Sequence, residues 1–171
     1  MQKLFLTFFG LGLLKPAPGT WGSVGGVLAG SLIALLFGLQ TLFFASILLC
    51  AASVQVINSY EAKVGQHDSS EIVIDEVAGV WLAQSLGCFA LVQNADGSFS
   101  QYAVAFSTEF VALSVAALVL FRFFDITKPS LIGRIDRNVK GGLGVMGDDM
   151  LAGAVAGLLT GVGFRLVSLI N

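Results

Sequence analysis

Long apolar segments alternate with short polar ones along the chain. Five of the apolar segments are close to the length that crosses about 30 Å of hydrocarbon as a helix. They are residues 22–37, 41–57, 77–92, 103–121 and 150–170. No charged residue occurs in residues 16–60, so the first two segments are expected to form a helical hairpin. The pattern predicts an all-α fold: a polytopic membrane helical bundle of about five transmembrane helices, in a single domain over residues 1–171.

A shorter apolar run precedes the first predicted span. Residues 4–14 lie between Lys3 and Lys15, and this run is too short to cross the bilayer, which takes about 20 residues. The sequence Pro16-Ala17-Pro18 that follows is a poor signal-peptide cleavage site. We therefore expect a short interfacial or re-entrant helix at the N-terminus.

The basic residues indicate the orientation, because Lys and Arg are retained in cytoplasmic loops. The loops at residues 38–40 and 93–102 contain no Lys or Arg, and only Arg165 lies near the far end of the last segment. The remaining cations fall on the other side: Lys3, Lys15, Lys63, Arg122, Lys128, Arg134, Arg137 and Lys140. We expect the N-terminus inside and the C-terminus outside.

Composition supports a membrane protein and excludes several other classes. Hydrophobic residues make up 56% of the chain and charged residues 12%, against about 45–50% and 25% in soluble domains. A net charge of −2 without a basic patch gives no sign of a nucleic-acid partner. Cys50 and Cys88 lie in apolar runs without metal-ligand spacing, so we expect no disulfide or zinc site. No obligate protein partner is predicted.

Paired acids precede two of the predicted spans. Segments 75–79 and 149–153 both read Asp, two residues, Ala and Gly, and a second acid lies beside each Asp. One carboxylate at a helix start has a structural explanation, since it can cap free N–H groups and interact with the helix dipole. The second acid favours a group of convergent carboxylates, for which hard oxygen ligands suit Mg²⁺. The predicted metal ligands are Asp75, Glu76, Asp148 and Asp149.

Cations and glycines alternate between the two acid pairs, in residues 121–149. Both can bind a phosphate, the cations by charge and the glycines through exposed N–H groups. Alternatively, the cations satisfy the positive-inside rule and bind anionic lipid heads, while the glycines only turn the chain. Acids, bases and a location at the headgroup plane together predict phosphoryl chemistry on a lipid head, with a metal-activated water as nucleophile.

Two further groups could take part. His67 and Asp68 lie shortly before Asp75 and could transfer protons, although an ordinary surface histidine is the alternative. Residues 15–23 supply a turn and a helix start, where Thr20 and Ser23 could cap the helix and backbone N–H groups could face an anion.

These motifs resemble the phosphatidylglycerophosphatase A family of bacterial inner-membrane lipid phosphatases. The resemblance covers nearly the whole chain, in ordered blocks. They are Pro18-Gly19-Thr20-x-Gly22-Ser23, His67-Asp68, Ile72-Val73-x-Asp75-Glu76-x-x-Gly79, Phe121-Arg122-x-x-Asp125-x-x-Lys128-Pro129, Asp136-Arg137 and Gly141-Gly142-x-Gly144-x-x-x-Asp148-Asp149. The resemblance implies a Mg²⁺-dependent enzyme of the cytoplasmic membrane face that hydrolyses the terminal phosphomonoester of phosphatidylglycerophosphate, releasing phosphate and phosphatidylglycerol.

We assign the expected roles accordingly. The four acids named above are expected to hold Mg²⁺, and His67, Asp68 and Asp125 are the catalytic candidates. Asp125 lies one helical turn after Arg122, so it could orient the guanidinium or join the metal ligands. The expected phosphate-binding residues are Thr20, Arg122, Lys128, Arg137 and Gly142.

Two other classes of protein compete with this interpretation. A small transporter of Mg²⁺ or protons would need ionisable or polar groups near the middle of the membrane, whereas the middle of each predicted span reads as apolar. A non-catalytic protein that binds anionic lipids would account for the bases but not for the paired acids.

Overall fold

The computed structural model describes residues 1–65, 69–91 and 107–170, and every element in these ranges is helical. Five helices are long and apolar enough to cross a membrane, as the hydrophobic pattern predicts. They are α2 (Pro18–Phe37), α3 (Leu39–Val64), α4 (Ile74–Cys88, extended by the 3-10 turn η2, Phe89–Leu91), α6 (Thr108–Thr127) and α8 (Gly142–Ile170). The short elements are α1 (Gln2–Leu6), η1 (Leu11–Leu13) and α7 (Leu131–Asn138).

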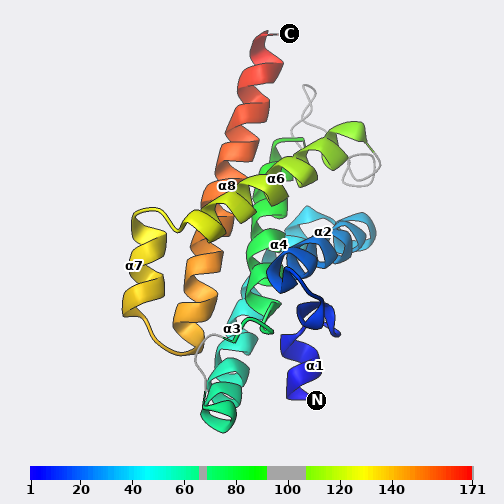
Figure 1. The fold of residues 1–171 in the computed structure, drawn as a ribbon. Helices are drawn as coiled ribbons and strands as arrows, with labels where there is room; N and C mark the ends of the chain where they lie inside the picture. Colours follow the sequence, from blue (N-terminus) through cyan, green and yellow to red (C-terminus); the bar gives the residue numbers. More distant parts are fainter. Residues whose placement is uncertain (66–68, 92–106, 171) are drawn as a thin grey trace.

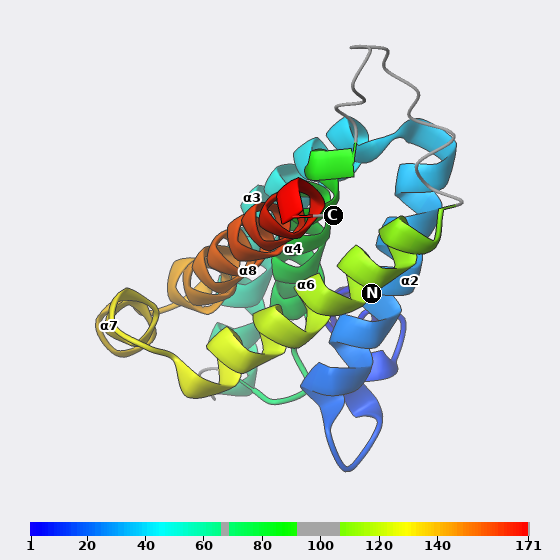
Figure 2. The ribbon, with the colours of Figure 1, turned by 90° about the horizontal axis from the view of Figure 1, so that it is seen from above.

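The central element of the bundle is α4. It contacts each of the other four long helices, most extensively α8, and lies between α8 on one side and α2 on the other (Figure 1, Figure 2). Small residues make this packing possible, since a Cβ on Gly153 of α8 would overlap the carbonyl oxygen of Gly79 of α4. On the other side, the Trp81 indole N–H donates to the carbonyl oxygen of Gly26 on α2, at 2.7 Å.

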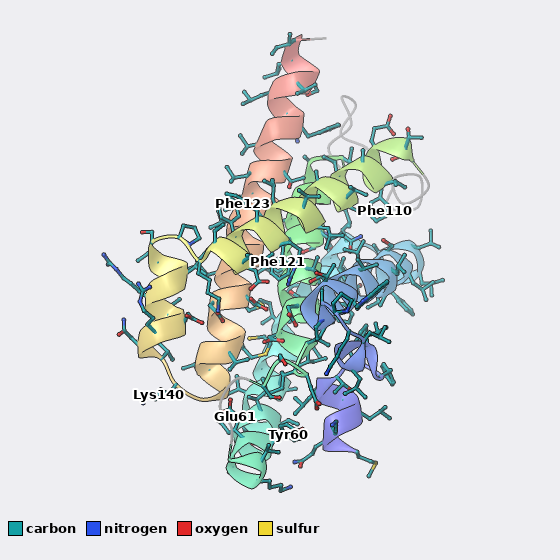
Figure 3. All side chains as sticks on the ribbon, in the orientation of Figure 1. Tyr60, Glu61, Phe110, Phe121, Phe123 and Lys140 are labelled. Atoms are coloured by element: carbon teal, nitrogen blue, oxygen red, sulfur yellow. The ribbon has the colours of Figure 1, made fainter. Side chains whose placement is uncertain are left out.

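The outer helices have one buried and one exposed side, as expected for a bundle surrounded by lipid. On α6, Phe121 is fully buried, whereas Phe123 is 56% exposed and points away from the bundle (Figure 3). The outer helices α2, α3 and α8 expose leucines and other large apolar side chains in the same way, whereas α4 is buried along most of its length. The N-terminal segment packs against α2 and α3. Its interfacial or re-entrant placement in a membrane stays a prediction.

The middle of the bundle is not wholly apolar, and the sequence-based expectation was wrong on this point. Gln84 of α4 is fully buried and donates through Nε2 to the hydroxyls of Ser31 on α2, at 2.8 Å, and Ser114 on α6, at 3.0 Å. Gly30 provides the space, because a Cβ there would approach the Gln84 amide oxygen. These are neutral groups that link three helices.

The start of the last span also differs from the prediction. α8 begins at Gly142, not at residue 150, because Asn58 of α3 accepts a hydrogen bond from the Gly142 amide at 2.7 Å. Gly142 and Gly144 also lie against the backbone at Val54 and Val139, where a Cβ would collide. The glycine-rich segment is therefore the first turns of a packed helix. Asp149 lies about two turns inside it and cannot cap it.

Candidate active site

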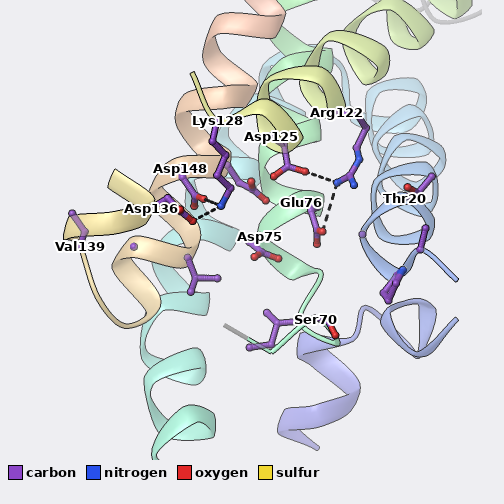
Figure 4. Close-up of a pocket in the computed structure, with 17 residues that line it drawn as sticks. Thr20, Ser70, Asp75, Glu76, Arg122, Asp125, Lys128, Asp136, Val139 and Asp148 are labelled. Atoms are coloured by element: carbon purple, nitrogen blue, oxygen red, sulfur yellow. Dashed lines mark hydrogen bonds and ion pairs between the residues drawn. The ribbon is translucent and has the colours of Figure 1, made fainter. Parts of the chain in front are cut away.

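A cavity of about 430 Å³ lies at the end of the bundle where α2 and α4 begin and α6 ends (Figure 4). It combines residues from segments that are far apart in the sequence. The lining residues are Ala17, Pro18, Gly19, Thr20, Ser70, Ile72, Asp75, Glu76, Arg122, Asp125, Lys128, Asp136, Val139, Gly144, Val145, Asp148 and Asp149. Most of the residues predicted for the site therefore face a common space.

Three of the four predicted metal ligands form a compact group. Ligand oxygens of Asp75, Glu76 and Asp149 all lie within 4.8 Å of one another. Asp75 and Glu76 are in the first turn of α4, and the close glycine packing of α4 on α8 brings Asp149 against them. Both aspartates are buried, and one carboxylate oxygen of Glu76 has no hydrogen-bond partner.

This group fits a small divalent cation. Octahedral ligand oxygens about 2.1 Å from an ion lie roughly 3 Å apart when adjacent and roughly 4 Å apart when opposite, so small side-chain shifts would close the group on one ion. Buried carboxylates repel one another unless a cation or protons neutralise them. The buried acidic group could therefore hold a metal ion.

The fourth acid, Asp148, takes a different role. Its carboxylate accepts a hydrogen bond from the Lys128 ammonium at 2.6 Å, and Lys128 also pairs with Asp136. The expected convergence of four carboxylates is thus only partly observed. Burial opposes the positive charge of Lys128, but the hydrogen bonds to Asp136 and Asp148 outweigh it and raise its pKa.

Arg122 of α6 lies on the other side of the acidic group (Figure 4). Its guanidinium donates to Asp125 at 2.5 Å, lies 3.6 Å from a Glu76 oxygen and contacts the hydroxyl of Ser23 at 3.4 Å. Gly19, in the first turn of α2, makes room for this arrangement, because a Cβ there would overlap the Glu76 carboxylate. Asp125 is therefore placed to orient Arg122, which is one of the two roles expected for it.

Of the predicted site residues that the structure describes, two do not line the cavity. Arg137 is exposed on α7 and does not line it. Gly142 is buried against α3, and its N–H is already bonded to Asn58. His67 and Asp68 lie outside the described residues.

Residues to which the sequence reasoning gave no role in the site also lie in or beside the cavity. Asp136 pairs with Lys128, whereas the sequence motif predicts a role for its neighbour Arg137. Gly19 lies against the Glu76 carboxylate, and Ser23, which is buried and does not itself line the cavity, accepts a hydrogen bond from Arg122. The sequence holds a signal for the difference between Asp136 and Arg137. If residues 132–139 form a helix, residues 132, 136 and 139 lie on one side of it and Arg137 lies on another.

Comparisons with known proteins agree with this arrangement. The family model for phosphatidylglycerophosphatase A matches residues 4–164. A protein of that name from Haemophilus influenzae is 35% identical over 148 residues, which are 86% of this chain and 79% of that protein. Its namesake from Escherichia coli is 33% identical over 156 residues, 91% of this chain and 79% of that protein. A Bacteroides thetaiotaomicron protein, provisionally named a phosphatidylinositol-3-phosphatase, is 31% identical over 166 residues, 95% of this chain and 92% of that protein.

No solved structure gives a significant match. The family match includes all the segments that line the cavity, from the start of α2 to Asp149. The resemblance noted in the sequence motifs is therefore confirmed over almost the full length, and the chain belongs to the phosphatidylglycerophosphatase A family of phosphatase enzymes.

Proposed function

We propose that the protein is a Mg²⁺-dependent phosphatase that hydrolyses the terminal phosphomonoester of phosphatidylglycerophosphate. The products are inorganic phosphate and phosphatidylglycerol. The observation that carries this proposal is the cavity in which Asp75, Glu76 and Asp149 lie beside two cations, Arg122 and Lys128. Two relatives whose names state this activity match most of the chain.

The acidic group supplies the metal ligands. Asp75, Glu76 and Asp149 would hold Mg²⁺, which prefers carboxylate oxygens and completes its coordination with water and substrate phosphate. A bound Mg²⁺ supplies Lewis acidity to a phosphoryl oxygen and activates water for attack. Asp148 is assigned to Lys128 instead, since its carboxylate is already bonded to that ammonium.

The two cations bind the phosphate. Arg122 and Lys128 are each held by carboxylates from two sides, which fixes their positions before substrate arrives. In the bound state each would donate to a phosphoryl oxygen and stabilise the charge that develops as water attacks phosphorus and the bond to the glycerol oxygen breaks. Thr20 lines the same cavity and offers a hydroxyl donor. His67 and Asp68 remain candidates for proton transfer.

The proposed location is the cytoplasmic face of the bacterial inner membrane, with the N-terminus inside. The cavity lies at the bundle end that carries Lys15, Lys63 and the cations of residues 122–140, which the positive-inside rule assigns to the cytoplasm. A lipid phosphate in the headgroup plane can reach a cavity at that end without crossing hydrocarbon.

The direct test measures phosphate release by the purified protein in detergent, with and without Mg²⁺. The substrates are phosphatidylglycerophosphate, phosphatidic acid, phosphatidylinositol 3-phosphate and a soluble phosphomonoester. We expect Mg²⁺-dependent release from phosphatidylglycerophosphate above the others. No release from any substrate would refute the enzyme assignment, and cation flux in sealed vesicles without substrate would favour the transporter hypothesis.

Asp149→Asn tests the metal ligands. The variant should lose Mg²⁺-dependent phosphate release and bind Mg²⁺ more weakly by calorimetry, because an amide replaces a charged ligand. Glu109→Gln is the matched control, since it removes an exposed carboxylate of α6 outside the cavity. Activity and Mg²⁺ affinity near those of the wild type in Asp149→Asn would remove this residue from the site.

A further inference from the structure

The short helix α7 has two sides of different character. Ile132 and Gly133 are buried against the bundle, and Asp136 and Val139 line the cavity. Arg134 and Arg137 are both exposed. At 100° per residue these two arginines lie on neighbouring positions of the outer side, since residues three apart are adjacent on a helix.

Within the described residues, the cations on this outer side have no ion-pair partner. Among the ion pairs found in the described ranges, none involves Arg134, Arg137 or Lys140, which follows α7 and is also exposed. The nearest acid of the helix, Asp136, is paired with Lys128 toward the cavity. The outer side of α7 therefore presents two exposed arginines on neighbouring positions, and Lys140 follows just beyond the end of the helix (Figure 3).

Contacts with α8 fix the depth of α7. Lys128, just before α7, reaches Asp148, and a Cβ on Gly147 would meet the side chain of Ile135. α7 thus runs beside the first two turns of α8 and not beyond its end (Figure 1). This level is that of the acidic cavity at the polar end of the spans, which in a membrane-spanning bundle is expected to lie in the headgroup region.

From this placement we propose that the outer side of α7, formed by Arg134, Arg137 and Lys140, binds the phosphate of an anionic phospholipid of the surrounding leaflet. Two guanidiniums one turn apart can each donate two hydrogen bonds to phosphate oxygens, which lysines cannot match in geometry. Leu131, 57% exposed at the start of the same helix, offers apolar surface to the lipid's acyl chain. The site is separate from the cavity and does not depend on the phosphatase assignment.

Native mass spectrometry of the purified protein in detergent tests the proposal, with phosphatidylglycerol and phosphatidylcholine as titrants. Arg134→Gln/Arg137→Gln should weaken binding of the first phosphatidylglycerol about fivefold for each arginine removed, as expected for basic groups at an anionic surface. Phosphatidylcholine binding should not change. Lys15→Gln/Lys63→Gln is the matched control, since it removes two exposed charges from the same end of the bundle. Arg134→Lys/Arg137→Lys should lose affinity to a smaller extent, because charge is kept and the planar fork is lost.

Both arginines are exposed, so the melting temperature of the double variant should equal that of the wild type. Unchanged phosphatidylglycerol affinity in Arg134→Gln/Arg137→Gln would overturn the proposal. An equal loss in the Lys15→Gln/Lys63→Gln control would also overturn it, because surface charge in general would then explain the binding. A change in oligomeric state without a change in lipid affinity would identify the surface as a protein contact instead.

Discussion

Replacing Lys128 by glutamine should destabilise the protein through the carboxylate that it leaves behind. The Lys128 ammonium lies 2.6 Å from Asp148, whose side chain is 6% exposed, and the lysine side chain itself is 29% exposed. Two unit charges at this separation attract by roughly 6 kcal/mol at an effective dielectric constant of about 20. Desolvation of both groups offsets most of this attraction, so we expect a coupling free energy of about 1–3 kcal/mol.

A double-mutant cycle isolates this coupling. Unfolding free energies of wild type, Lys128→Gln, Asp148→Asn and the double variant are measured by equilibrium unfolding in mixed micelles with increasing sodium dodecyl sulfate. Because Asp148→Asn removes the uncompensated charge, the double variant should be more stable than Lys128→Gln alone. A coupling free energy below about 0.5 kcal/mol, with no recovery in the double variant, would show that the pair does not form in the membrane protein.

Lys128, Gly19 and Gln84 each allow a further test. The pKa of Lys128 is raised above its ordinary value of 10.5. Its contribution to stability is therefore complete below pH 10.5 and is lost as the pH rises through the higher pKa of the folded state. The melting temperature of the wild type should approach that of Lys128→Gln at alkaline pH, and a constant difference between the two would contradict this. Gly19→Ala should lower phosphate release about tenfold, because overpacking against the Glu76 carboxylate costs about 1–3 kcal/mol; unchanged release would mean that Glu76 moves freely. Gln84→Leu should lower the unfolding free energy by about 1 kcal/mol, since two hydrogen bonds inside the bundle are lost. Phosphate release per folded molecule should stay unchanged. A loss of release without a loss of stability would show that Gln84 also positions the site.

The spans and the acidic group could be predicted from local sequence, but the exact partners could not. Five apolar segments indicate five spans because length and hydropathy are local properties. The start of α8 was misplaced because the acceptor for the Gly142 amide is Asn58, 84 residues away in the chain. Without that contact, a glycine-rich segment reads as a loop.

The same limit explains where the geometry of the site differs from the expectation. Asp148 and Asp149 are neighbours in the chain, yet successive residues of a helix point about 100° apart, so one faces Lys128 and the other faces the α4 acids. Arg137 and Asp136 are separated in the same way on α7. Residue type and spacing therefore predicted which segments meet, whereas the side of each helix decided which side chains meet.

The contact between Gly79 and Gly153 also bears on which ion the site would prefer. Since these residues meet through their backbones, main-chain atoms set the distance between α4 and α8, and with it the gap between Asp75 and Asp149. Mg²⁺ takes oxygens at about 2.0–2.1 Å and Ca²⁺ at about 2.3–2.6 Å, although both accept the same carboxylates. Discrimination between a small and a large divalent ion would then depend on how tightly two membrane helices approach, and that approach is set by two residues that offer no side-chain ligand.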